Sequence, residues 1–173
     1  MNHEERLANW KHHPSQRNLF SLELYKKMMT NDKIVFITGD LGYATFDAQK
    51  EDFPDRFHNV GASEQFMLDF AVGLALSGKL PVVYSITPFL LYRGFETLRT
   101  YVNHEKIPVI LVGGGRDYCY SHDGMSHWAH DVKPIMDNLK NIQQYWPETA
   151  EDILQAITDV VKSENPSFIS LRR

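Results

Sequence analysis

Short apolar runs alternate with helix-periodic segments along almost the whole chain of 173 residues. A strand that is apolar on both faces has to be covered on both faces, as in a parallel sheet that lies between helices. The sequence therefore predicts an α/β fold, a three-layer α/β/α arrangement around a mostly parallel sheet. The runs predict strands at 34–38, 81–86, 107–112, 142–146 and 168–171, and the periodic segments predict helices at 16–30, 63–78, 88–104, 134–139 and 148–163.

The length and charge of the chain narrow its class. Residues 1–15 are polar and form an irregular N-terminal lead-in by pattern, and we expect one domain over 16–173. A formal charge of −4 gives no electrostatic case for nucleic acid or an anionic membrane as partner. No signal peptide is visible and no apolar run approaches the roughly 20 residues of a membrane span, so we expect a cytoplasmic protein. Cys119 is the single cysteine, which excludes an internal disulfide and a zinc site built on thiolates.

Ligands of such sheets bind beyond the carboxyl ends of the strands, so function is expected in the segments 39–42, 59–64, 87–92 and 113–127. In the second of these, Ser63 and Glu64 open a predicted helix. Ser63 is a suitable helix cap and Glu64 is favoured there by the helix dipole. The alternative is that Glu64 points into a ligand crevice as an acid/base or hydrogen-bonding carboxyl group.

The densest polar cluster lies between residues 121 and 131, with three histidines and two aspartates. The spacing matches no common helical metal-ligand pattern, and we expect no metal to be held by this chain. Either the histidines contact a polar or anionic substrate, or they are structural loop residues. The aromatic residues Phe89, Tyr92 and Phe95 beside Arg93 are typical of core packing, and they could also form a wall on which a flat ring stacks.

Taken in order, these segments resemble one family, the pyrimidine-binding domain of transketolase-type thiamine diphosphate enzymes, over about residues 17–173. The most specific element is Pro-x-Arg-Phe-x-Asn-x-Gly-x-x-Glu-Gln at 54–65. It is preceded by Gly39-Asp40-Leu41 and followed by Phe89-Leu90-Leu91-Tyr92-Arg93, Asp123-Gly124-Met125-Ser126-His127 and Phe168-Ile169-Ser170-Leu171-Arg172.

The resemblance implies a role for each matching residue. Glu64 matches the catalytic glutamate that hydrogen-bonds the N1′ nitrogen of the cofactor's aminopyrimidine, which favours the tautomer that takes the proton from thiazolium C2. Tyr92 or Phe89 matches the aromatic residue on which the pyrimidine stacks. Asp40 matches an acidic residue that lies near the cofactor at the subunit contact. His127, also expected to be catalytic, and Asp123 match polar residues that face the donor substrate. The substrate-phosphate arginines of the family match Arg172 and Arg17.

Two departures from the family pattern shape the expected function. The Gly-Asp-Gly and Asn that hold Mg²⁺ and the diphosphate are missing, and the family's histidine after the third strand is replaced by the region 116–118. We therefore expect the pyrimidine-binding subunit of a split transketolase-like enzyme, a transferase that moves a two-carbon ketol or acyl unit from a ketose to an aldehyde. A separate diphosphate-binding subunit would hold Mg²⁺, in an α2β2 heterotetramer. The alternatives are a β-type subunit of a 2-oxo acid decarboxylase or dehydrogenase, a deoxyxylulose-phosphate-synthase-like enzyme, or a non-catalytic binding module.

Overall fold

The computed structural model describes residues 15–173, so the expected lead-in at 1–15 lies almost entirely outside the described residues. A sheet of six strands, all parallel, forms the centre of the molecule in the order β2-β1-β3-β4-β6-β5. This confirms the predicted α/β class. The strands are β1 (Ile34–Thr38), β2 (Phe57–Asn59), β3 (Leu80–Ile86), β4 (Ile110–Gly114), β5 (Gln143–Tyr145) and β6 (Ser167–Leu171).

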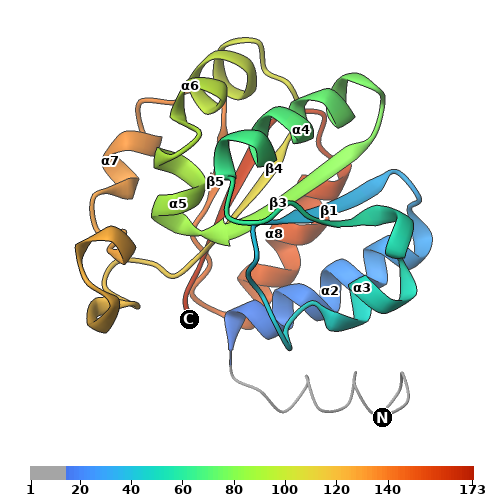
Figure 1. Cartoon of the computed structure of the whole chain (residues 1–173), viewed down its shortest axis with the longest axis horizontal. Helices are drawn as coiled ribbons and strands as arrows, with labels where there is room; N and C mark the ends of the chain where they lie inside the picture. The colour runs from blue at the N-terminus through green and yellow to red at the C-terminus, as the bar shows by residue number, and fades with distance from the viewer. Residues whose placement is uncertain (1–14) are drawn as a thin grey trace.

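Helices cover both faces of the sheet, which confirms the three layers (Figure 1). One layer contains α2 (Gln16–Thr30), α3 (Asp47–Asp52) and α8 (Ala150–Lys162). The other contains α4 (Glu64–Leu76), α5 (Thr87–Tyr92), α6 (Phe95–Thr97), the π-helical segment η2 (Leu98–His104) and α7 (Val132–Met136).

Alternation of side chains along each strand divides the interior into two cores. In β1, Ile37 packs with α4 and α5 residues on one face, whereas Phe36 packs with α2 and α8 residues on the other. Both side chains are fully buried. The strands are apolar on both faces because both faces are covered, as the sequence pattern required.

The predicted helix at 88–104 is wrong as a single element, because the chain breaks after α5. Gly94 lies between α5 and α6 and packs directly against α4: a Cβ built on Gly94 would lie 2.5 Å from Leu68 Cδ1. The connection between β3 and β4 therefore packs against α4 at Gly94, the residue between α5 and α6. This places Arg93, the residue before the break, beside the start of α4.

The third predicted strand begins later than the run of apolar residues. Its ladder starts at Ile110, which pairs with Val82, rather than at Ile107. Pro108 has no N–H to donate to a ladder, and Lys106 adopts a positive φ of 58°. The polar stretch before residue 59 holds α3, the 3₁₀ turn η1 (Pro54–Arg56) and the short strand β2.

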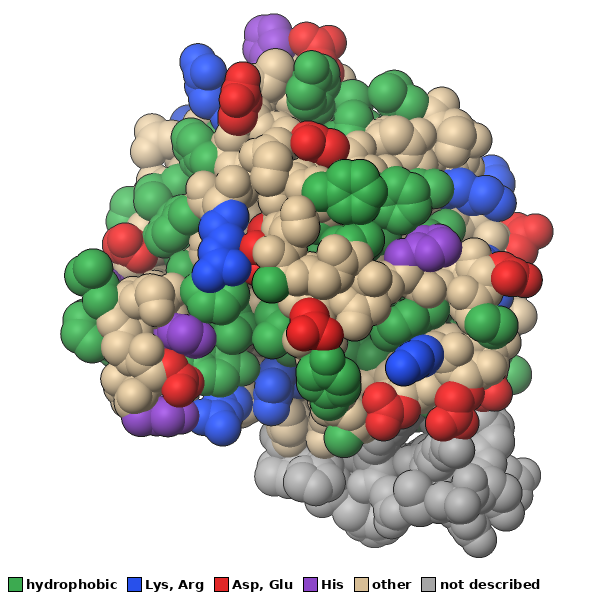
Figure 2. All heavy atoms as spheres, in the orientation of Figure 1, with side chains coloured by type: hydrophobic (Ala, Val, Ile, Leu, Met, Phe, Trp, Pro, Cys, Tyr) green, Lys and Arg blue, Asp and Glu red, His purple; other side chains and the backbone are tan. Residues whose placement is uncertain are grey.

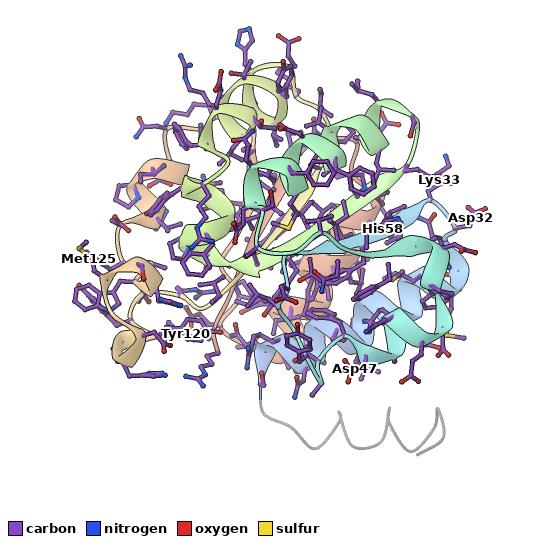
Figure 3. All side chains as sticks on the ribbon, viewed as in Figure 1. Asp32, Lys33, Asp47, His58, Tyr120 and Met125 are labelled. Carbon is purple, nitrogen blue, oxygen red and sulfur yellow. The ribbon has the colours of Figure 1, made fainter. Side chains whose placement is uncertain are left out.

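Because every strand is parallel, the carboxyl ends of the strands meet at one edge of the sheet. The segment between β4 and α7 lies on that side of the molecule, marked by Tyr120 and Met125 in Figure 3, while Asp32 and Lys33 before β1 lie on the opposite side. Two 3₁₀ turns, η3 (Ser121–Asp123) and η4 (Met125–His127), shape this segment. Among residues 15–173, no helix has the length and apolar character to cross a membrane.

Candidate active site

Glu64 is the first residue of α4 and its side chain is buried, with 3% of its surface exposed. The preceding residue, Ser63, occupies the N-cap position, but its side chain makes no capping hydrogen bond. The expected hydroxyl cap is therefore wrong, and the helix start is not held by Ser63 Oγ. A buried carboxylate at a helix N-terminus is favoured by the helix dipole but still needs a polar partner.

Arg93 supplies that partner. Its Nη1 donates to both oxygens of Glu64, at 2.9 Å each. The same guanidinium lies over the ring of Phe89, with 3.7 Å from Cζ to the ring centroid. Phe89 and Arg93 are four residues apart, at the end of α5, so they share one side of the helix. The result is a compact group of one carboxylate, one cation and one aromatic ring.

The backbone after β1 closes the other side of this group. A Cβ on Gly39 would lie 3.1 Å from the carbonyl oxygen of Gly61 and 3.9 Å from Oε1 of Glu64. A side chain on Gly39 would therefore crowd the Gly61 carbonyl oxygen and would come into ordinary contact with the Glu64 carboxylate.

Asp40, which follows, adopts a positive φ of 59° and lies at the surface. Its N–H donates to Oδ1 of Asn59 at 2.8 Å, and Asn59 Nδ2 donates back to its carboxylate at 3.3 Å. Tyr43 also donates its hydroxyl to this carboxylate. These hydrogen bonds, that of Tyr43 first, hold the pKa of Asp40 below its ordinary value. The structure thus fixes Asp40 in a pair with the β2 end, apart from the contacts of Glu64.

The two aromatic candidates on α5 face different neighbours. Phe89 contacts Arg93 and, edge-on, the ring of His127, with 4.8 Å between ring centroids. Tyr92 packs against the core and donates its hydroxyl to Asp131 at 2.6 Å. Burial first, and then the bond to Asp131, raise the pKa of Tyr92. Phe89 is therefore the ring that Arg93 links to Glu64, and Tyr92 connects α5 to the segment before α7.

His127 joins the Phe89 group, whereas Asp123 does not contact it. Nδ1 of His127 lies 3.0 Å from Oγ of Ser126. Asp123 is exposed and lies 3.2 Å from Nε2 of His122. No group of three His, Cys, Asp or Glu side chains within residues 15–173 is arranged to hold a metal ion.

Four arginines gather near the ends of β4 and β6. Arg17 Nη1 donates to the Tyr120 hydroxyl at 3.3 Å, and its buried Nε has no hydrogen-bond partner among the described residues. Arg172 donates to both oxygens of Glu148 at 3.1 Å, which raises its pKa. Arg173 lies over the ring of Tyr120, 5.1 Å from Cζ to the centroid.

The fourth of these, Arg116, lies in the region where the family's histidine is replaced and is buried, with 5% of its surface exposed. It donates to the carbonyl of Pro147 at 3.0 Å, to the carbonyl of Ser170 and to Glu148 at 2.5 Å. Burial lowers the pKa of this guanidinium. All of these partners belong to the domain itself, so Arg116 joins β4, β6 and the start of α8.

The residue that sequence reasoning missed is Arg93. The pattern marks it only as a neighbour of the aromatic stripe, although a charged residue four positions after Phe89 on one helix face is a recognisable signal. Its partner lies 29 positions earlier in the chain, so the pairing needed the fold.

An aromatic patch also lies on the outer side of α4, where Figure 2 shows hydrophobic side chains gathered on the surface. Phe66 is 53% exposed and stacks on Phe70, with 5.9 Å between the centroids and 7° between the planes. Phe70 in turn meets the ring of His58 edge-on at 5.4 Å. Glu64, Phe66 and Phe70 therefore belong to the first two turns of one helix, and His58 of β2 packs beside them.

Comparison with known proteins gives a consistent picture. A family model described as the transketolase pyrimidine-binding domain matches residues 12–173. An apulose-4-phosphate transketolase subunit of Actinobacillus succinogenes is 32% identical over 121 residues, which cover 70% of this chain and 39% of that protein. The 1-deoxy-D-xylulose-5-phosphate synthase of Corynebacterium glutamicum is 40% identical over 156 residues, which cover 88% of this chain and 24% of that protein.

Among solved structures, a split gene transketolase in an inactive beta4 tetramer superposes with a TM-score of 0.81 at 28% identity. The match covers 92% of this chain and 51% of that chain. The chain therefore spans about half or less of the length of the proteins it matches.

Proposed function

Because the chain belongs to the transketolase pyrimidine-binding domain family, we propose that it binds the aminopyrimidine of thiamine diphosphate and acts with a diphosphate-binding subunit as a transferase. The reaction is the transfer of a two-carbon ketol unit from a ketose donor to an aldehyde acceptor. The observation that carries the proposal is the buried Glu64 carboxylate, which Arg93 links to the ring of Phe89.

The described residues fit a flat, hydrogen-bonding ring. Glu64 presents two carboxylate oxygens in a setting with 3% exposure, and Gly39 near them carries no side chain. Phe89 offers an aromatic face to the same flat group, Arg93, that bonds the carboxylate, and on such a face a heteroaromatic ring gains stacking energy. A carboxylate and an aromatic face side by side suit an aminopyrimidine better than they suit a phosphate or a metal ion.

When bound, thiamine diphosphate supplies a thiazolium carbon that serves as nucleophile and electron sink for cleavage of a C–C bond beside a ketone. Glu64 shares a hydrogen bond with the ring nitrogen N1′ and holds or releases a proton there. Its burial keeps water away from that hydrogen bond, which strengthens it. Phe89 orients the ring through stacking, and Tyr92 holds α5 in place through Asp131.

On the substrate side, His127 is the nearest candidate because its ring touches Phe89. We propose that His127 contacts the carbonyl or a hydroxyl group of the donor substrate. Asp123, four residues earlier in the same segment, is proposed to contact the donor as well. Arg17 and Arg172 remain the candidates for an anionic end of the substrate. Arg17 is the better placed, since its Nε lacks a partner among residues 15–173 while Arg172 is engaged by Glu148.

The partner subunit would hold Mg²⁺ and the diphosphate, for which the 173 residues contain no Gly-Asp-Gly. The patch formed by Phe66, Phe70 and His58 supports a protein partner, because stacked aromatic side chains left exposed are typical of interfaces. We propose an α2β2 assembly in which this side of α4 faces the partner.

A second candidate function is acyl transfer from a pyruvate-like donor. It is favoured by the 40% identity to a 1-deoxy-D-xylulose-5-phosphate synthase. Turnover measured with ketose donors and with pyruvate, each with the same aldehyde acceptor, separates the two reactions. If pyruvate supports turnover and the ketose donors do not, acyl transfer replaces ketol transfer as the proposed reaction.

The test of catalysis is Glu64→Gln in the enzyme reconstituted with its diphosphate-binding partner. A neutral amide of the same shape cannot exchange a proton at N1′, so we expect turnover to fall about 10²–10⁴-fold. Glu151→Gln on the exposed side of α8 is the matched control and is expected to leave the rate unchanged. An unaltered rate for Glu64→Gln contradicts the assignment.

The test of the partner is binding rather than rate. The chain alone is expected to bind thiamine diphosphate weakly and to be inactive, and added partner is expected to restore both. Phe66→Ser should weaken association with the partner, measured by sedimentation, while Leu154→Ser, 39% exposed on α8, should not. If the two variants associate equally well with the partner, α4 does not lie in the interface.

A further inference from the structure

Arg93 contacts both side chains that the aminopyrimidine ring of the proposed cofactor would need, Glu64 and Phe89. Its Nη1 contacts both carboxylate oxygens of Glu64 at 2.9 Å, and its flat guanidinium lies 3.7 Å above the Phe89 ring. A guanidinium is planar, presents N–H groups at its edge and stacks on aromatic faces. An aminopyrimidine has the same three properties.

Two flat groups cannot hold these partners at the same time. A ring that hydrogen-bonds Glu64 and stacks on this face of Phe89 has to take the position of the guanidinium, because the guanidinium already lies 3.7 Å from the centre of that face and bonds both carboxylate oxygens at 2.9 Å. Arg93 therefore has to release Glu64 before the ring reaches it.

We infer that Arg93 is a positioning residue that competes with the aminopyrimidine of the cofactor for Glu64 and Phe89. It holds the buried carboxylate oriented and paired, and it swings outward when the ring enters. This inference rests on the proposed function, and it adds that the cofactor's affinity is set in part by an internal competitor.

The exposure of the two partners is consistent with such an exchange. The side chain of Arg93 is 47% exposed, whereas that of Glu64 is 3% exposed. A half-exposed arginine regains hydration when it leaves, but a buried carboxylate left alone is strongly unfavourable. The exchange therefore requires that the incoming ring satisfy Glu64 as Arg93 departs.

The first experiment measures the affinity of thiamine diphosphate, by calorimetry with Mg²⁺, for the complex of the chain with its diphosphate-binding partner. Arg93→Met removes both the charge and the planar fork, so the competitor is lost. We expect binding about two- to fivefold tighter than in the wild type, because a pair with one half-exposed partner contributes up to about 1 kcal/mol. Arg99→Met, an exposed arginine on η2, is the control and is expected to leave the affinity unchanged.

Equal or weaker binding by Arg93→Met would overturn the competition, because a residue that merely supports the site loses affinity when removed. If Arg93→Met does not fold, Arg93→Lys replaces it: a lysine keeps the charge but cannot stack flat on Phe89, and a smaller gain in affinity is expected.

The second experiment uses the wild-type complex and follows the arginine side-chain Nε–H signals by nuclear magnetic resonance. The Arg93 signal, assigned by its loss in Arg93→Lys, should move toward the position of a hydrated arginine when thiamine diphosphate is added, and the Arg99 signal should not. An unmoved Arg93 signal in a complex that binds the cofactor contradicts the inference alone. A wild-type complex that binds no cofactor contradicts the proposed function, and the competition fails with it.

Discussion

Gly94 is the point at which the crossover after β3 rests on α4, and Gly94→Ala tests how closely the site depends on that contact. The new Cβ would lie 2.5 Å from Cδ1 of Leu68 and 3.3 Å from the carbonyl oxygen of Glu64. Leu68 is fully buried, so its side chain has no solvent-facing position to move to. The backbone of Gly94 has a φ of −109°, which alanine adopts without strain, so crowding is the only unfavourable effect.

The magnitude follows from two opposing contributions. Overpacking of a filled core costs about 1–3 kcal/mol. Replacing glycine by alanine restricts the unfolded chain and returns about 0.4–1 kcal/mol. The net expectation for Gly94→Ala is a loss of about 1–2 kcal/mol, which at about 2–4 °C per kcal/mol lowers the Tm by about 2–8 °C.

The matched control is Gly73→Ala, on the exposed side of α4. A Cβ there meets no atom within 4 Å, so only the favourable contributions remain. We expect about 0.5–1 kcal/mol of stabilisation because alanine is the better helix former. Urea and thermal unfolding of the two variants and the wild type give the comparison. Stability of Gly94→Ala equal to or above that of the wild type would refute the close contact between Gly94 and Leu68.

Three further perturbations test features outside the proposed chemistry. Arg116→Met should cost about 2–4 kcal/mol in urea unfolding, because it leaves the buried carbonyls of Pro147 and Ser170 without their donor; a loss below about 1 kcal/mol would show that these carbonyls find other donors. Thr149→Ala removes the capping box of α8 and should cost about 0.5–2 kcal/mol, with Thr149→Ser restoring most of it. Hydrogen bonds from the helix start hold the pKa of Asp152 below its ordinary 3.8, so its contribution is complete above pH 3.8 and is lost as the pH falls further. The stability difference between wild type and Asp152→Asn should therefore shrink below that pH, and a difference independent of pH would contradict the cap.

Local pattern was sufficient to predict the layers of this fold, but not every boundary within them. The strand at 34–38 and the helix at 16–30 were predicted at their observed bounds, since runs apolar on both faces and helix-periodic segments report on neighbours a few residues away. The helix at 88–104 was predicted unbroken because its apolar spacing continues through Gly94. At the break, Gly94 leaves room for Leu68, which lies 26 positions earlier, so this contact is invisible to a pattern that reads neighbours along the chain.

The site likewise has residues that the sequence pattern identifies and contacts that only the fold determines. The motif identifies Glu64, and its burial agrees with a functional carboxyl group. The choice between Phe89 and Tyr92 stayed open in the sequence, because both lie on one turn of a helix. The fold separates them, since the hydroxyl of Tyr92 is held by Asp131, whereas Phe89 lies under the Arg93 guanidinium.

Two glycines allow the backbone to approach the start of α4 closely on either side of Glu64 along the chain. On one side, Gly39 brings the end of β1 to the Gly61 carbonyl and the Glu64 carboxylate; on the other, Gly94 brings the crossover to the first turn of α4. The polar partner of the carboxylate is the Arg93 guanidinium, which bonds both of its oxygens and lies over the Phe89 ring. A group that replaces Arg93 at both partners must therefore be flat and must offer a hydrogen bond at its edge, so the Glu64 carboxylate and the Phe89 ring together restrict the chemistry of the ligand.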